Sequence, residues 1–218
     1  MQTTTFNKRI YTLTSFKSGM HEVIAHLDDL QAAAHSKYIN HAFAEKIMVV
    51  VSRVNSCRYC CYGHSRAALI AGVSETELQS LLALELKVFP TNEVVALTFA
   101  QHYAETNCQP DPAAWQRVVS YYGEETANVI LAYLRMITFG NLLGNTFDAL
   151  LSRMIGKPAP SSSLSSELEV LLGVFWVLPS RLILRLISKK TSNLVPFINL
   201  QTKFKTRRSI YENRCNHR

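Results

Sequence analysis

The segment HAFAEKIMVVVSRV, residues 41–54, restricts the fold of this chain more than any other stretch. Nine of its 14 residues are apolar, so most of it must be buried. Its three consecutive valines are compatible with a β-strand. Its length and its AFAEKI start, however, favour a helix that is covered on most sides. We therefore predict a central buried helix at residues 41–54.

The rest of the chain also favours helices. Only 8 glycines and 7 prolines occur in 218 residues, and apolar residues recur with helical spacing. Ser74 and Glu77 form a capping box before a further apolar run. We predict an all-α domain whose other main helices cover residues 19–36, 57–71, 91–106, 112–121, 124–138 and 141–154.

The composition changes near residue 156. The segment GKPAPSSSLSS, residues 156–166, is typical of a linker. We predict a main domain at residues 1–155, the linker at 156–166, and an amphipathic helix with a basic tail at 167–218. Ser166 and Glu169 are predicted to cap that helix.

The positive charge of the chain lies in its tail. Residues 181–218 hold ten Lys and Arg and one acidic residue, whereas residues 1–180 have a small negative balance. Arg181, Arg185 and Lys189 are four residues apart, so they share one face of the predicted helix. This helix either lies on an anionic membrane surface or docks on the main domain or a neighbouring subunit. The domain itself lacks the charge pattern of a nucleic-acid-binding protein.

The N-terminal segment is polar and has no signal-peptide pattern. We predict a cytoplasmic protein, with membrane association through the C-terminal helix as an additional feature. In a reducing compartment, closely spaced cysteines are more often catalytic or metal-binding than structural.

The segment NSCRYCCYGH, residues 55–64, holds three of the five cysteines. Asn55 and Ser56 end the preceding helix and offer N-cap side chains. In the helix that follows, Cys57, Cys60 and His64 are three and four residues apart, so they form one stripe. Backbone N–H groups in the first helical turn stabilise a thiolate at Cys57, and His64 is placed to accept a proton.

Glu45 is a carboxylate in the middle of the buried helix at residues 41–54. A buried carboxylate needs a partner. If this helix packs against the cysteine helix, Glu45 faces His64 and orients it as a base. His41, one turn before Glu45, is the alternative partner.

The pattern Glu45, Cys57-Arg58-Tyr59-Cys60 and His64, followed by AALIAGVSETEL, resembles the AhpD-like alkylhydroperoxidases of the carboxymuconolactone decarboxylase superfamily. The resemblance covers about residues 35–155 and implies an AhpD-like helical domain. It implies a thiol-dependent peroxidase, an oxidoreductase that reduces hydroperoxides with no bound metal or organic cofactor.

The resemblance also implies a role for each residue. Cys60 is the peroxidatic cysteine, Cys57 is the resolving cysteine, and Glu45 and His64 form a proton relay. A lipoyl or thioredoxin-like partner reduces the disulfide, and the chain assembles into trimers or hexamers. Some family members carry a second histidine where this chain has Tyr59.

The same residues are compatible with other functions. The cysteines form a zinc site if Cys108 and His102 supply further ligands, or they are buried packing residues. Cys61 either competes with Cys57 as the resolving partner or faces the core, and Cys108 and Cys215 are expected to be free thiols. Two alternatives to the peroxidase are a thiol-disulfide exchange or redox-sensing protein and a non-enzymatic membrane-associated module. A carboxymuconolactone-type decarboxylase is disfavoured, because decarboxylases of this superfamily generally lack the cysteine pair.

Overall fold

The computed structural model describes residues 6–34 and 39–192; within helices, the side chains of residues 32, 34, 177, 178, 181, 182 and 184–192 are left undescribed. The described part is all-α, as predicted, with no strand. Its helices are α1 (Leu13–Ala25), α2 (Leu27–Ala34), α3 (His41–Val54), α4 (Arg58–Ile70), α5 (Glu75–Ala83), a short 3₁₀ turn (Leu86–Val88), α6 (Thr91–Glu105), α7 (Pro112–Tyr122), α8 (Glu124–Met154) and α9 (Leu164–Ser192).

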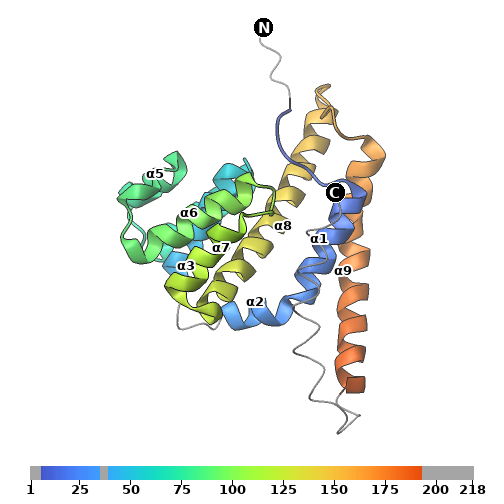
Figure 1. The fold of residues 1–218 in the computed structure, drawn as a ribbon. Helices are drawn as coiled ribbons and strands as arrows, with labels where there is room; N and C mark the ends of the chain where they lie inside the picture. Colours follow the sequence, from blue (N-terminus) through green and yellow to red (C-terminus); the bar gives the residue numbers. More distant parts are fainter. Residues whose placement is uncertain (1–5, 35–38, 193–218) are drawn as a thin grey trace. The chain divides into compact units, whose positions relative to one another are not determined.

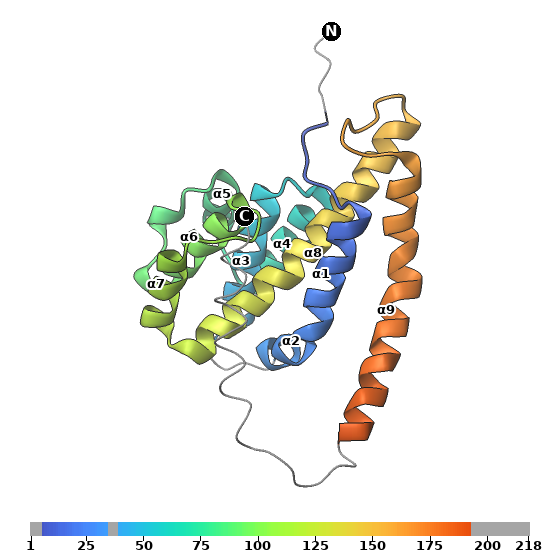
Figure 2. The same ribbon diagram turned by 45° about the vertical axis from the view of Figure 1, so that its right-hand side comes forward.

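The chain divides into two units, residues 1–178 and 179–218. The predicted linker at 156–166 lies inside the first unit. The tail after residue 192 lies outside the described residues, as does the predicted basic face of α9. In the first unit, α8 runs between α3 and α7 on one side and α1 on the other (Figures 1 and 2).

Helix α3 is the buried centre predicted from its sequence. Every residue from Phe43 to Ser52 is buried, and α3 contacts α4, α5, α6 and α8. Asn40 caps its N-terminus by accepting the backbone N–H of Phe43 at 2.8 Å. Burial on all sides explains why the valine run forms a helix despite its β-propensity.

Helix α8 replaces the two helices predicted at residues 124–138 and 141–154. Gly140 does not interrupt it, since a helical glycine costs only about 1 kcal/mol and α8 packs against α1, α2, α3, α4, α6 and α7. In the described part of the chain, α8 is also the one helix long and apolar enough to cross a bilayer by length and composition. Its buried residues account for that apolar composition.

The predicted helix at residues 19–36 is two helices. Thr12 and Ser15 form a capping box, so α1 begins earlier than predicted. At His26 the backbone leaves the helical conformation (φ −107°, ψ 19°), and α2 begins at Leu27. Residues 35–36 lie outside the described residues.

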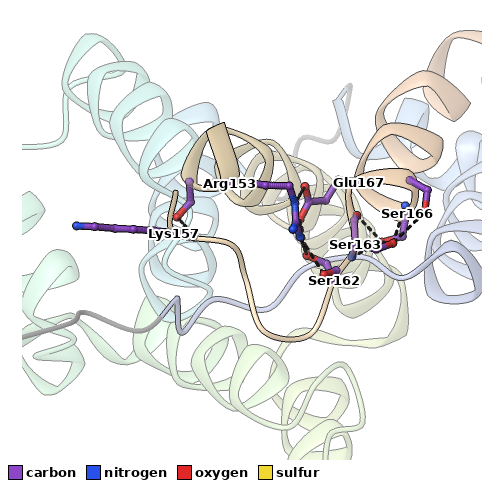
Figure 3. A network of polar contacts seen from close by, with 8 residues as sticks. Arg153, Lys157, Ser162, Ser163, Ser166 and Glu167 are labelled. Carbon is purple, nitrogen blue, oxygen red and sulfur yellow. Dashed lines mark hydrogen bonds and ion pairs between the residues drawn. The ribbon is translucent and has the colours of Figure 1, made fainter. Parts of the chain in front are cut away.

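The loop between α8 and α9 is held by a polar network (Figure 3). Arg153 donates two hydrogen bonds of 2.9 Å to the carboxylate of Glu167, which is 1% exposed. Arg153 also donates to the carbonyl of Ser162 at 2.9 Å. The predicted capping box of Ser166 with Glu169 is wrong, because Ser163 and Ser166 cap each other's backbone N–H and α9 begins at Leu164.

A cluster of charges around the buried Lys46 joins α3 to α5 and α6. The ammonium group of Lys46 lies 2.6 Å from Glu77 and 2.8 Å from Glu93. Glu77 also accepts the backbone N–H of Ser74, completing the predicted capping box. The hydrogen bond from Lys46 is the main cause that lowers the pKa of Glu77 from 4.5 to about 2.

This cluster predicts a pH-dependent stability. Glu77→Gln keeps the cap but removes the ion pair, so we expect it to lower the free energy of unfolding by about 1 kcal/mol at pH 7. Because the pKa of Glu77 is depressed in the folded state, its contribution exists above about pH 4.5 and disappears as the pH falls toward about 2.

Urea unfolding at several pH values measures this difference. The gap between wild type and Glu77→Gln should shrink in acid. Glu75→Gln, at an exposed carboxylate in the same helical turn, is the control and should change little. A gap that does not depend on pH would contradict the assignment.

Candidate active site

The turn between α3 and α4 brings the cysteine segment into the core. Ser56 adopts a left-handed conformation (φ 57°), and the N–H of Cys57 returns to the carbonyl of Ser52 at 3.1 Å. The N-cap of α4 is Cys57, whose sulfur accepts the N–H of Cys60 at 3.4 Å. The prediction that Asn55 or Ser56 supplies this cap is therefore wrong, since Asn55 is the C-cap of α3.

Cys57 and Cys60 lie side by side as two free thiols. Their sulfurs are 2.6 Å apart and share one hydrogen bond, whereas a disulfide bond would bring them to about 2.05 Å. Cys57 is completely buried, and Cys60 is partly exposed. The spacing predicted from the sequence therefore gives a pair that needs little movement to become a disulfide.

The two sulfurs differ sharply in acidity. The hydrogen bond between the two sulfurs is the main cause that lowers the pKa of Cys57 from 9.0 to about 7. The backbone N–H groups of Tyr59 and Cys60 and the charge of Lys8 also lower it. The same hydrogen bond, together with burial, raises the pKa of Cys60. In the reduced pair, Cys57 is therefore the more acidic thiol, and Cys60 is the one that keeps its proton.

Glu45 joins the cysteine helix to the centre of the fold. It is 5% exposed, and its Oε2 lies 2.7 Å from Nδ1 of His64. Its other oxygen lies 3.3 Å from Nε2 of His41. Glu45 therefore meets both of the partners considered from the sequence. Because Nδ1 of His64 faces the carboxylate, Nε2 of that ring is left to exchange a proton.

His64 and Cys60 are one turn apart on α4, so both lie on the same helix face. The ring of His64 is about a quarter exposed. Glu45, Cys57, Cys60 and His64 thus all lie along the α3–α4 contact, which combines two sulfurs, an imidazole and a buried carboxylate. This arrangement can hold a thiolate and move protons to and from it.

Asp148 on α8 is a buried acid that the sequence reasoning missed. Its carboxylate accepts hydrogen bonds from Lys8 at 2.6 Å and from the Tyr59 hydroxyl at 2.7 Å, and Arg58 lies 2.6 Å away. Burial alone would raise the pKa of Asp148, but these partners hold it below its usual range. The network anchors the first turn of α4 to α8. A charged residue within an apolar helix was the available signal, as it was for Glu45.

Gly144 on α8 is the second residue that the sequence reasoning missed. A Cβ atom at this position would lie 2.8 Å from the sulfur of Cys57 and 3.8 Å from that of Cys60. The absence of a side chain therefore creates the space that the sulfurs occupy. A glycine inside a helical pattern often has such a packing reason, which was the available signal.

Other candidate residues lie outside this arrangement. Burial raises the pKa of the Cys61 thiol, which disfavours it as a nucleophile. Cys108 follows α6 and is a free, partly buried thiol, as predicted. Cys215 lies outside the described residues. Within the described ranges, no three His, Cys, Asp or Glu side chains gather closely enough to hold a metal ion.

The acidity of Cys57 is directly testable. We expect an ultraviolet titration of the reduced protein to show one thiolate appearing with a midpoint near pH 7, because the Cys60 thiol and the helix N-terminus stabilise the anion. Cys57→Ser should remove this transition, while Cys108→Ser should leave it unchanged. A single transition near pH 9 in the wild type would contradict the assignment.

The space at Gly144 generates a second prediction. Gly144→Ala would place a methyl group against the sulfur of Cys57, so we expect disulfide formation between Cys57 and Cys60 to slow at least about tenfold. Gly140→Ala is the matched control on the same helix, because nothing lies within 4 Å of a Cβ there. It should stabilise the fold by about 1 kcal/mol. Equal oxidation rates in both variants would show that the close approach has no consequence.

Comparison with known proteins relates part of the chain to a family. Residues 22–99 match the carboxymuconolactone decarboxylase family, and no curated protein or solved structure matches the chain. The match includes α3 and α4 with all four predicted residues, whereas Gly144 and Asp148 on α8 lie beyond it. Residues 22–99 are therefore similar to this family, which includes the AhpD-like proteins.

Proposed function

We propose that the chain is a thiol-dependent peroxidase that reduces hydroperoxides through the Cys57–Cys60 pair. The observation that carries this proposal is the pair itself. Two free sulfurs lie 2.6 Å apart at a helix N-terminus, beside a histidine that a buried carboxylate orients.

Exposure and acidity divide the roles between the two cysteines. Cys60 is the sulfur that a peroxide reaches, because Cys57 is completely buried. Cys60 carries the proton of the pair, so it needs a base before it attacks. His64, one turn away on α4 and held by Glu45, is that base. Cys57, whose pKa is lowered to about 7, is readily ionised for the second step.

The first step oxidises Cys60. Its sulfur attacks the terminal oxygen of the hydroperoxide, an S–O bond forms, and the O–O bond breaks with its electron pair leaving on the alkoxide. The proton released by the thiol passes through His64 to that alkoxide. The products are an alcohol and a sulfenic acid at Cys60.

The second step closes the disulfide. The Cys57 thiolate attacks the Cys60 sulfur, an S–S bond forms, and the departing hydroxide takes a proton to become water. An external dithiol, of lipoyl or thioredoxin-like type, then reduces the disulfide by exchange and is itself oxidised. The net reaction converts hydroperoxide and dithiol into alcohol, water and a disulfide.

We further propose that the chain works as a homo-oligomer, a trimer or a hexamer. Helix α4 buries only Ala68 within the described chain. Tyr62 and Ile70 on the same helix are 65% and 81% exposed. Such an apolar surface beside a candidate active site suits a contact between copies of the chain.

Thiol-disulfide exchange without peroxide turnover is the second candidate function. The pKa of Cys57, about 7, favours it because a thiolate at neutral pH is what exchange with another disulfide requires. In that function Cys57 attacks and Cys60 resolves, so the roles of the cysteines are reversed.

Peroxide consumption with reduced lipoamide tests both functions. We expect turnover by the wild type, loss of at least about 1,000-fold in Cys60→Ser, and a loss of about 100-fold in His64→Ala. Cys57→Ser should complete one oxidation and then stop, because the sulfenic acid cannot be resolved. Cys108→Ser is the control and should keep full activity.

Mass spectrometry of the cysteines after one equivalent of peroxide completes the experiment. Sulfenic acid at Cys60 in Cys57→Ser would support the peroxidase. A wild type that forms the disulfide with a thiol oxidant but consumes no peroxide would exclude the peroxidase and favour exchange. A pair that remains alkylatable after both treatments would exclude both functions.

A further inference from the structure

The first half of α9 carries an apolar stripe on its exposed side. Phe175 and Trp176 are 73% and 79% exposed, and Leu168 and Leu172, seven and three residues before Phe175, are 39% and 55% exposed. These spacings place the four side chains along one face of a helix. Exposed aromatic residues on a continuous apolar face mark an interaction surface.

The opposite side of this half of α9 is fixed to the domain. Val170 is completely buried in a cluster with Phe16. A Cβ atom at Gly173 would come within 2.9 Å of the same phenyl ring, so helix and ring are in close contact. One turn before Val170, Glu167 accepts a hydrogen bond from Arg153 (Figure 3). The helix cannot rotate to bury the stripe without breaking these contacts.

The sequence that follows the stripe is strongly basic. Residues 181–218 contain ten Lys and Arg and a single acidic residue. We propose that the stripe of Leu168, Leu172, Phe175 and Trp176 lies on an anionic membrane surface, toward which the basic segment attracts the chain. Aromatic side chains favour the interface between lipid headgroups and hydrocarbon, and basic segments bind anionic lipids.

Charge also argues against a second copy of the chain as the occupant. Two copies that met through this stripe would bring together two segments with nine net positive charges each. Their repulsion would oppose the contact. An anionic bilayer satisfies the apolar and the basic features at the same time.

Flotation of the full chain with lipid vesicles tests this surface. We expect the wild type to float with vesicles of phosphatidylcholine containing about one third phosphatidylserine, and not with phosphatidylcholine alone. High salt should weaken the binding. The double variant Phe175→Ser with Trp176→Ser should lower the partition coefficient at least about tenfold. Val88→Ser, at an exposed apolar residue of the 3₁₀ turn, should bind as the wild type does.

Fluorescence shows whether the stripe itself enters the lipid. In a Trp115→Phe background, Trp176 is the remaining tryptophan, and its emission should shift to the blue when anionic vesicles are added. Failure of the wild type to float, or equal flotation of the double variant, would overturn the proposal. A double variant that loses self-association, with no flotation of either protein, would also overturn it and would assign the stripe to a second copy.

Discussion

The packing of the Cys57 sulfur against α8 is the constraint on which the site depends. The sulfur of Cys57 caps the N-terminus of α4, so the backbone N–H of Cys60 in the first helical turn holds it in place. Gly144 leaves only enough room for that sulfur, and Asp148, one turn further along α8, binds Tyr59 beside it. Contact with Gly144 and the hydrogen bond from Tyr59 to Asp148 thus fix the start of α4 against α8. This fixed position sets the spacing of the two sulfurs. The redox chemistry proposed for the pair depends on a helix that contributes no sulfur.

Helix α3 contributes Glu45 to the site, and it buries two charged side chains. Glu45 and Lys46 are neighbours in a helix whose other central residues form the core, and they point to different partners. Lys46 binds two carboxylates and secures α5 and α6. Glu45 binds two histidines, of which His41 is exposed to solvent and His64 is partly covered. A carboxylate between a covered and an exposed imidazole connects the interior of the site to bulk water. This connection suits a reaction that must move protons at each step.

The sequence predicted most of this arrangement because the signals were local. The all-α class, the buried α3 helix, the capping box of Ser74 with Glu77, and the stripe of Cys57, Cys60 and His64 depend on residues within a few turns of one another. The wrong or missed predictions occur where long-range packing outweighs a local sequence signal. Gly140 did not divide α8, because contacts with six helices outweigh its cost. Gly144 and Asp148 lie more than 80 residues from Cys57, and only the packing of α8 brings them to it.

The stripe on α9 and the sulfur pair lie in different parts of the fold. Its inward face is fixed by Phe16 and Arg153, near the loop that ends α8, whereas the sulfur pair lies against the middle of that helix. Substitutions at Phe175 and Trp176 therefore leave every contact of the sulfur pair in place. The positive charge is concentrated in residues 181–218, so the rest of the chain is nearly neutral. Attraction of the basic segment to an anionic surface therefore does not have to perturb the Cys57 thiol. Substitutions can therefore alter surface binding and thiol chemistry independently. The proposed membrane contact can be tested separately from the proposed peroxidase.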